Sequence, residues 1–240
     1  RDVDLAQTII GVNYYDGQGF MVPKKLGVKS AKELDGASVC IQTGTTTELN
    51  LAEFFAGNNM KYNPVPIETN AEAQELYKAG RCDVYTTDAS GLYATKMSFD
   101  NPSAHVVLPE IVSKEPLGPV VRHGDDQWAD IVSWVLRAMM SAEEKGITSK
   151  NVKKLAAQDN KDKEINRLLG KDPLQGLSKL GLSADWAVNV ISQVGNYAES
   201  FERNLYPLTI VRGMNALYRD GGLHYICLLY TSPSPRDNPA

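Results

Sequence analysis

Residues Cys40–Glu48 (CIQTGTTTE) join a β-prone run to a helical pattern through a turn rich in hydroxyl groups. Thr45 and Glu48 have the spacing of a capping box, and apolar residues then recur at helical intervals as far as Gly57. The amides at such a helix start, helped by the helix dipole and the threonine hydroxyls, can hold a carboxylate or a phosphate. The segment therefore predicts an anion site at Thr45 and Thr46.

A second chemical group follows another β-prone run, because Asp88 comes directly after residues 83–87. A carboxylate beside an anion site suits a zwitterion, since it can pair with an ammonium group. The alternative is structural, because most strand–glycine–threonine–helix junctions are capped turns without a ligand. Nucleotide phosphates are disfavoured: Gly44 is not followed by Lys and Ser/Thr, and Gly17–Gly19 lacks the third glycine and the helix of a dinucleotide fingerprint.

Composition excludes several classes of protein. The 240 residues, 42% of them hydrophobic, suffice for one large domain or two lobes. A net charge of -4 without a dense Lys/Arg block argues against nucleic acid as a partner. No apolar run approaches the roughly 20 residues that span a bilayer. His105, His123 and His224 have no ligand spacing with cysteine or carboxylate residues, so neither a metal site nor a cofactor is expected.

Residues 1–112 alternate short apolar strands with helical patterns, which is typical of a parallel α/β sheet. Strands are expected at 19–22, 38–42, 83–86 and 105–108, with a weaker one at 63–67. One helix is expected after Thr45, and another is expected to be capped by Asn70 and to run through Ala79. Ligands bind beyond the carboxyl ends of parallel strands, where the threonine turn and Asp88 lie.

The sequence after residues 116–119 (PLGP) is mainly helical. It predicts a helix capped at Asp125, then shorter helices, then a long helix from Ser183. Trp, Met and Leu recur at intervals of three and four residues, which indicates core packing rather than a cofactor site. Two acidic pairs are interpreted as helix charges rather than catalytic groups: Asp125–Asp126 at a helix start and Glu143–Glu144 on a solvated face.

Two cysteines lie in the predicted sheet. Cys40 is in the strand before the threonine turn, and Cys82 directly precedes the strand that leads to Asp88. If these strands are neighbours, the two cysteines lie side by side; a disulfide, which implies an oxidising compartment, is favoured over two reduced core cysteines. The third cysteine falls in residues 226–240, which resemble translated read-through of a sequencing adapter and are expected to be a non-native tail.

Four motifs carry a resemblance to a known family. They are residues 11–20 (GVNYYDGQGF), 42–48 (QTGTTTE), 80–88 (GRCDVYTTD) and 195–197 (GNY). In order and spacing they resemble the general L-amino-acid-binding periplasmic proteins of ABC importers, which are family 3 solute-binding proteins. The resemblance runs from Arg1 to about Tyr225. It implies an α/β, type II periplasmic-binding-protein-like fold, in which two lobes joined by two hinge strands close on an amino acid.

The same resemblance implies a domain organisation. Residues 1–20 would be the remnant of the first lobe and the first hinge, and residues 21–115 the second, ligand-binding lobe. Residues 116–225 would form the second hinge and a helical part that packs on the first lobe. Because most of the first lobe and the signal peptide would precede Arg1, the chain is expected to be truncated. Uncovered apolar helix faces would then make the isolated chain poorly stable.

Roles for individual residues follow from the resemblance. Thr45 and Thr46 would hold the α-carboxylate of the ligand, and Asp88 would pair with its α-ammonium group. Arg1 stands where relatives place an arginine that grips the same carboxylate, a task that suits its bidentate guanidinium group.

The remaining expected site residues would border these groups. Gln42 and Asn70 would line the pocket for the ligand side chain, and Tyr14 and Tyr15 would lie near the cleft or the hinge. The implied function is that of a periplasmic monomer, not an enzyme, which captures L-amino acids with broad specificity and delivers them to permease subunits of an ABC importer.

Two alternatives use the same fold. The first is a dehydratase-like enzyme in which Asp88 or Glu48 transfers a proton, although no paired base and nucleophile supports it. The second is the ligand-binding domain of a membrane receptor, which requires transmembrane segments.

Overall fold

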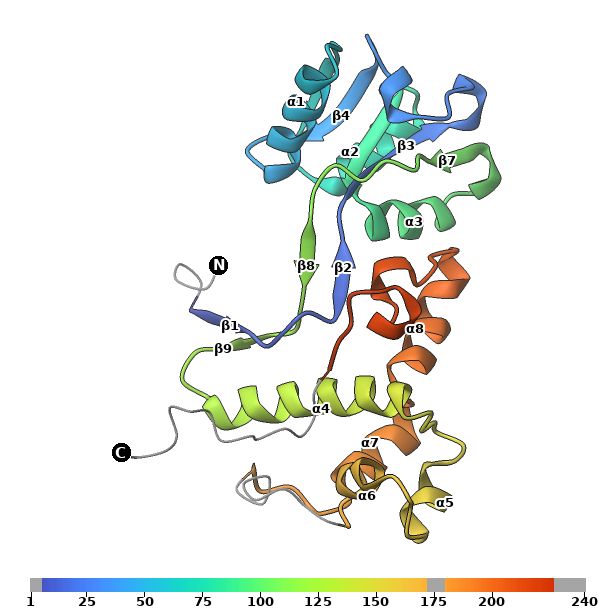
Figure 1. The fold of residues 1–240 in the computed structure, drawn as a ribbon. Helices are drawn as coiled ribbons and strands as arrows, with labels where there is room; N and C mark the ends of the chain where they lie inside the picture. Colours follow the sequence, from blue (N-terminus) through green and yellow to red (C-terminus); the bar gives the residue numbers. More distant parts are fainter. Residues whose placement is uncertain (1–5, 172–179, 227–240) are drawn as a thin grey trace. The chain divides into compact units, whose positions relative to one another are not determined.

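The computed structural model describes residues 6–171 and 180–226 (Figure 1). The chain divides into two compact units. The first, which we call the sheet unit, contains Tyr14–Leu117 and Leu208–Ile210. The second, which we call the helical unit, contains the described parts of residues 6–13, 118–207 and 211–226.

The sheet unit is built on a five-stranded sheet with the order β5-β4-β6-β3-β7. The strands are β3 (Gln18–Pro23), β4 (Ser38–Gln42), β5 (Asn63–Ile67), β6 (Val84–Asp88) and β7 (His105–Val107). The expected strands are thus present, with bounds that differ by no more than two residues. Outside this sheet, β2 (Tyr14–Asp16) pairs antiparallel with β8 (Glu115–Leu117).

The expectation of a parallel sheet is correct only in part. β4 runs parallel to β5 and β6, but β3 runs antiparallel to β6 and β7. β3 is buried along almost its whole length. A continuous apolar run of this kind indicates a buried strand but carries no information about direction, and this explains the error.

Three helices connect the strands of this sheet: α1 (Thr46–Gly57), α2 (Asn70–Lys78) and α3 (Ala89–Met97). Three short 3-10 helices accompany them, at Lys24–Leu26, Ala31–Glu33 and Pro102–Ala104. The cap predicted for α2 is wrong by one residue, because Thr69 accepts a hydrogen bond from the amide of Glu72 (3.2 Å) and Asn70 is the first helical residue. Thr69 and Glu72 have the same spacing as Thr45 and Glu48, which makes threonine the better cap at both helix starts.

Apolar side chains fill both faces of the sheet. On one face, Phe20 and Val22 of β3 pack in a cluster with Leu51 and Phe55 of α1. On the other face, the intervening Met21 packs in a cluster that includes side chains of α2 and α3. Successive side chains of β3 thus point to opposite faces of the sheet, with α1 on one face and α2 and α3 on the other. This is the arrangement expected for an α/β sheet covered on both faces.

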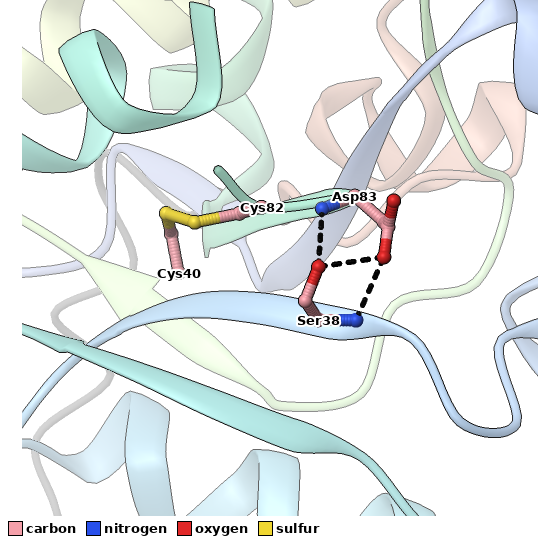
Figure 2. The surroundings of a disulfide bond; sticks show 4 residues. All are labelled: Ser38, Cys40, Cys82 and Asp83. Carbon is pink, nitrogen blue, oxygen red and sulfur yellow. Dashed lines mark hydrogen bonds between the residues drawn. A yellow bond between two sulfur atoms is a disulfide. The ribbon is translucent and has the colours of Figure 1, made fainter. Parts of the chain in front are cut away.

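A disulfide joins Cys40 in β4 to Cys82, just before β6, with 5.6 Å between the Cα atoms (Figure 2). The favoured interpretation of the two sheet cysteines is therefore confirmed. Next to the disulfide, Asp83 accepts hydrogen bonds from the amide (2.9 Å) and hydroxyl (2.6 Å) of Ser38, and its own amide donates to that hydroxyl (2.9 Å). The amino-terminal parts of β4 and β6 are thus held by a covalent link and three hydrogen bonds.

The helical unit contains one strand pair and five α-helices in its described part. The antiparallel pair is β1 (Gln7–Ile9) with β9 (Val120–Arg122). The helices are α4 (Asp126–Glu144), α5 (Val152–Ala157), α6 (Lys163–Leu168), α7 (Trp186–Val194) and α8 (Tyr197–Leu205), followed by 3-10 helices at Tyr206–Leu208, Gly213–Asn215 and Tyr218–Asp220. Asp125 caps α4 as predicted, since its carboxylate accepts from the amide of Trp128 (3.0 Å).

The long helix predicted from Ser183 is wrong, because two helices occupy this region. α7 ends before Gly195, which has a φ of 86°. A new helix then starts with a capping box between Asn196 and Glu199. A glycine with positive φ followed by an asparagine cap ends one helix and begins another within two residues.

The interpretation of α4 also needs correction at two side chains. Trp128 is 53% exposed rather than part of the core. Glu143, expected on a solvated face, has a side chain only 13% exposed and pairs with Arg212 at 2.8 Å. Arg212 in turn lies over the rings of Tyr197 (5.2 Å) and Phe201 (5.1 Å). The helical pattern could not reveal a partner 69 residues away.

Stability of the helical unit is expected to fall between pH 6.5 and 4. Burial, and secondly the Arg212 charge, lower the pKa of His224 to about 4. The ring lies against Tyr197, 3.2 Å from its hydroxyl. Between pH 6.5 and pH 4, His224 binds a proton in the unfolded chain but stays mostly neutral in the folded protein. Up to about 3 kcal/mol of the free energy of unfolding is therefore lost by pH 4.

Urea unfolding at several pH values would measure this loss. The His224→Phe variant keeps an aromatic ring against Tyr197. Its free energy of unfolding should fall by up to about 3 kcal/mol less between pH 6.5 and pH 4 than that of the parent protein. Equal pH dependence in the two proteins would contradict the prediction.

Candidate functional site

Five of the residues expected to bind a ligand lie at one edge of the sheet unit: Gln42, Thr45, Thr46, Asn70 and Asp88. β4 pairs in parallel with β5 and with β6, so the carboxyl ends of these three strands face the same way. β4 ends at Gln42, shortly before α1, and β6 ends at Asp88. β5 ends at Ile67, shortly before Asn70 at the start of α2. The sheet thus brings together, at one edge, three separate segments that local sequence patterns had singled out.

The turn before α1 is organised by internal hydrogen bonds. Gly44 has a φ of 71°, and its amide donates to the Glu48 carboxylate (2.8 Å). The Thr45 hydroxyl donates to the carbonyl of Gln42 (2.7 Å) and accepts from the amide of Glu48 (3.4 Å). Glu48 therefore reaches one residue further back than in a standard capping box. The hydroxyl proton of Thr45 is already used within the turn.

Further donors lie on the next two residues. Within the described ranges, the amides of Thr46 and Thr47 and the hydroxyl of Thr46 have no hydrogen-bond partner. Thr46 is exposed and Thr47 is half-buried. The first amides of a 12-residue helix, with the positive end of its dipole, are suited to a carboxylate.

Thr45→Ala is expected to lower the free energy of unfolding by about 1 kcal/mol, because it removes the cap of α1. Urea unfolding would measure the change. Thr46→Ala is the matched control and should leave stability close to that of the parent protein, since its exposed hydroxyl bonds to no protein group. An equal loss in both variants would show that the cap is not responsible.

Asp88 is the last residue of β6 and directly precedes α3. It is half-buried, its backbone takes the N-cap position of α3, and its side chain makes no capping hydrogen bond. In the sheet it stands opposite Gln18 of β3. A carboxylate at a strand end can pair with a cationic group.

The two residues expected in a side-chain pocket border the same edge. The Gln42 amide donates to the carbonyl of Glu68 (2.8 Å), and this bond joins the ends of β4 and β5. Asn70 is exposed at the first position of α2. Both offer polar groups without a formal charge.

Tyr14 and Tyr15 lie in β2, where they pair in register with Leu117 and Pro116 of β8. Burial, followed by the charges of Asp16 and Tyr93, raises the pKa of Tyr14 to about 12. Its hydroxyl therefore keeps its proton at neutral pH. Arg1, the proposed second carboxylate ligand, lies outside the described residues, as does the suspected tail at 226–240 except for its first residue.

Two buried polar residues near this edge were not predicted. Asp16 accepts hydrogen bonds from the amide of Gly17 (2.9 Å) and from the hydroxyl and amide of Ser90 in the first turn of α3. Gln18 donates to Thr47 and Thr86. The signal available in the sequence was a pair of polar residues shortly before the apolar run Phe20–Val22, since polar groups that become buried beside such a run require partners.

The described residues were searched for a metal site and for a membrane span. Among residues 6–171 and 180–226, no group of three or more His, Cys, Asp or Glu side chains could hold a metal ion. In the same part of the chain, no helix has the length and apolar character needed to cross a membrane.

The fold and sequence both match known proteins. A periplasmic binding protein of an ABC transporter from Brucella ovis, solved with glutathione bound, superposes with a TM-score of 0.86; it is 52% identical, and the match covers 94% of this chain and 71% of that one. The chain belongs to the family of periplasmic solute-binding proteins of ABC transporters. It is therefore a periplasmic binding protein and not an enzyme.

Curated relatives are similar over the same range. The general L-amino acid-binding periplasmic protein AapJ of Rhizobium johnstonii is 56% identical over 229 residues. The glutamate/glutamine/aspartate/asparagine-binding protein BztA of Rhodobacter capsulatus is 55% identical over 228 residues. Each match covers 94% of this chain and 67% of the relative, so the chain spans about two thirds of their length. No protein-family model matches the sequence.

Proposed function

We propose that this protein captures L-amino acids and delivers them to the permease subunits of an ABC importer. The observation that carries the proposal is the parallel pairing of β4 with β6. This pairing brings the start of α1 and the carboxylate of Asp88 to one edge of the sheet. An amino acid carries the two complementary charges on neighbouring atoms.

Each charge has a proposed partner. The α-carboxylate accepts hydrogen bonds from the amides of Thr46 and Thr47 and from the hydroxyl of Thr46. The α-ammonium group pairs with Asp88. Thr45 acts indirectly, since its hydroxyl holds the turn that aims these amides. Arg1 is proposed as a second ligand of the carboxylate.

Broad specificity is proposed for the ligand side chain. Gln42 and Asn70 are neutral and can donate or accept hydrogen bonds, so they select neither sign of charge. The names of two relatives support a broad range of ligands. One is named for L-amino acids in general, and the other for two acidic amino acids and their amides. The structure from Brucella ovis contains glutathione, which is a γ-glutamyl peptide with the α-carbon groups of glutamate.

The organisation of the protein is also a proposal. Residues 21–115 act as the ligand-binding lobe, and residues 1–20 and 116–225 supply the hinges and the remaining lobe. The protein is also proposed to work as a monomer. Sedimentation equilibrium at micromolar concentration would test this point.

Isothermal titration of the protein with a panel of L-amino acids and glutathione tests the function. We expect several L-amino acids to bind, D-enantiomers to bind much more weakly, and each ligand to be recovered unchanged after hours of incubation. Backbone amide NMR signals of Thr46 and Thr47 should shift on binding. If no ligand produces heat or shifts in these signals, the proposed function is wrong; steady consumption of a ligand would instead favour the dehydratase-like enzyme.

A further inference from the structure

Gln18 connects three elements of the candidate site. Its side chain belongs to β3, is 1% exposed, and lies opposite Asp88 in the sheet register. Its amide nitrogen donates to the carbonyl of Thr47 in the first turn of α1 (3.1 Å) and to the hydroxyl of Thr86 in β6 (3.0 Å). One carboxamide therefore ties the start of α1 to the strand that ends at Asp88.

The other end of this carboxamide is unsatisfied. The Oε1 atom of Gln18 is buried and has no hydrogen-bond partner among the described residues. Rotating the amide would not help, because its oxygen would then face the carbonyl of Thr47, which cannot donate. A buried acceptor without a donor opposes folding, so its presence requires an explanation.

The two partners of Gln18 do not depend on it. The Thr47 carbonyl lies within α1 and accepts the helical hydrogen bond from four residues further on. The Thr86 hydroxyl donates to the carbonyl of Gly19 (2.7 Å). Loss of the carboxamide would thus remove one unsatisfied oxygen and create none. Stability alone does not account for glutamine at this position.

We propose that Gln18 is a positioning residue of the amino-acid site, an inference that rests on the proposed function. Its two hydrogen bonds fix the first turn of α1 against β6. This holds the amides of Thr46 and Thr47 and the carboxylate of Asp88 at the separation that the two charges of an amino acid require. The buried Oε1 atom without a donor destabilises the folded protein, and this is the energetic cost of holding the site in place.

The test compares affinity with stability in Gln18→Met, which keeps the side-chain length and removes the polar groups. We expect the dissociation constant for L-glutamine, or for the best ligand of the parent protein, to rise about tenfold. The melting temperature should stay the same or rise. Gln74→Met is the matched control, because Gln74 also donates to a threonine hydroxyl in this unit, that of Thr95 (3.3 Å), and should leave the affinity unchanged.

The outcomes separate the two hypotheses. If the parent protein binds no amino acid, the proposed function fails. If the parent protein binds but Gln18→Met binds equally well, only the role of Gln18 is wrong. A lower melting temperature, with or without weaker binding, would make Gln18 a structural residue and would also overturn the inference.

Discussion

Asp88→Ala is expected to weaken the binding of L-amino acids by roughly 100-fold, or about 3 kcal/mol. The substitution removes the anion proposed to pair with the α-ammonium group and leaves that group facing a half-buried strand end. The cost is large because an ammonium group that leaves water needs a charged partner. Isothermal titration with the same ligand panel would measure it.

The control for this variant is Asp100→Ala, which removes an exposed carboxylate from the same unit. It should keep the parent affinity and thus exclude an effect of net charge alone. Asp88→Asn would separate charge from shape, and we expect it to bind nearly as weakly as the alanine variant. Parent-like affinity in Asp88→Ala would show that the ammonium group binds elsewhere.

Removing the disulfide with Cys40→Ala and Cys82→Ala is expected to destabilise the sheet unit by roughly 4 kcal/mol. The bond closes a loop between residues 42 positions apart, and the entropy that it removes from the unfolded chain grows with loop length. Both cysteines are at most 1% exposed, so part of their packing is lost as well. Urea unfolding of the oxidised parent and the double variant would give the difference.

Reductant provides the control for this prediction. It should shift the urea midpoint of the parent protein toward that of the double variant and leave the variant unchanged. Because the sulfur atoms are buried, reduction in native buffer should be slow and should accelerate at low urea concentrations. Identical midpoints for the oxidised and reduced parent protein would show that the bond does not stabilise the unit.

Local sequence patterns were sufficient for much of the sheet unit. The strand at Ser38–Gln42 and the cap at Thr45 were predicted at their correct positions. The disulfide followed from the expectation that the strand containing Cys40 and the strand that follows Cys82 are neighbours. Each of these features depends on short-range spacing or on one common topology rule, so the sequence alone contained enough information.

Features that depend on distant partners were missed. The direction of β3 is set by its neighbours β6 and β7, and no pattern within β3 encodes it. Glu143 resembled a surface residue because Arg212 lies far along the chain. The hydrogen-bonding role of Gln18 was likewise missed, although the residue belongs to an incomplete glycine motif and to the motif of residues 11–20, since both of its side-chain partners are at least 29 residues away.

The donors at the start of α1 are mainly backbone amides, and this has a consequence for robustness. An amide does not titrate between acid and neutral pH, and replacing its side chain with any residue except proline leaves it in place. Acid that protonates His224 would therefore weaken the helical unit without removing the donors at Thr46 and Thr47. Substitution of either threonine would remove a hydroxyl group but keep the backbone amides. Carboxylate binding at this helix start should therefore tolerate many changes of sequence.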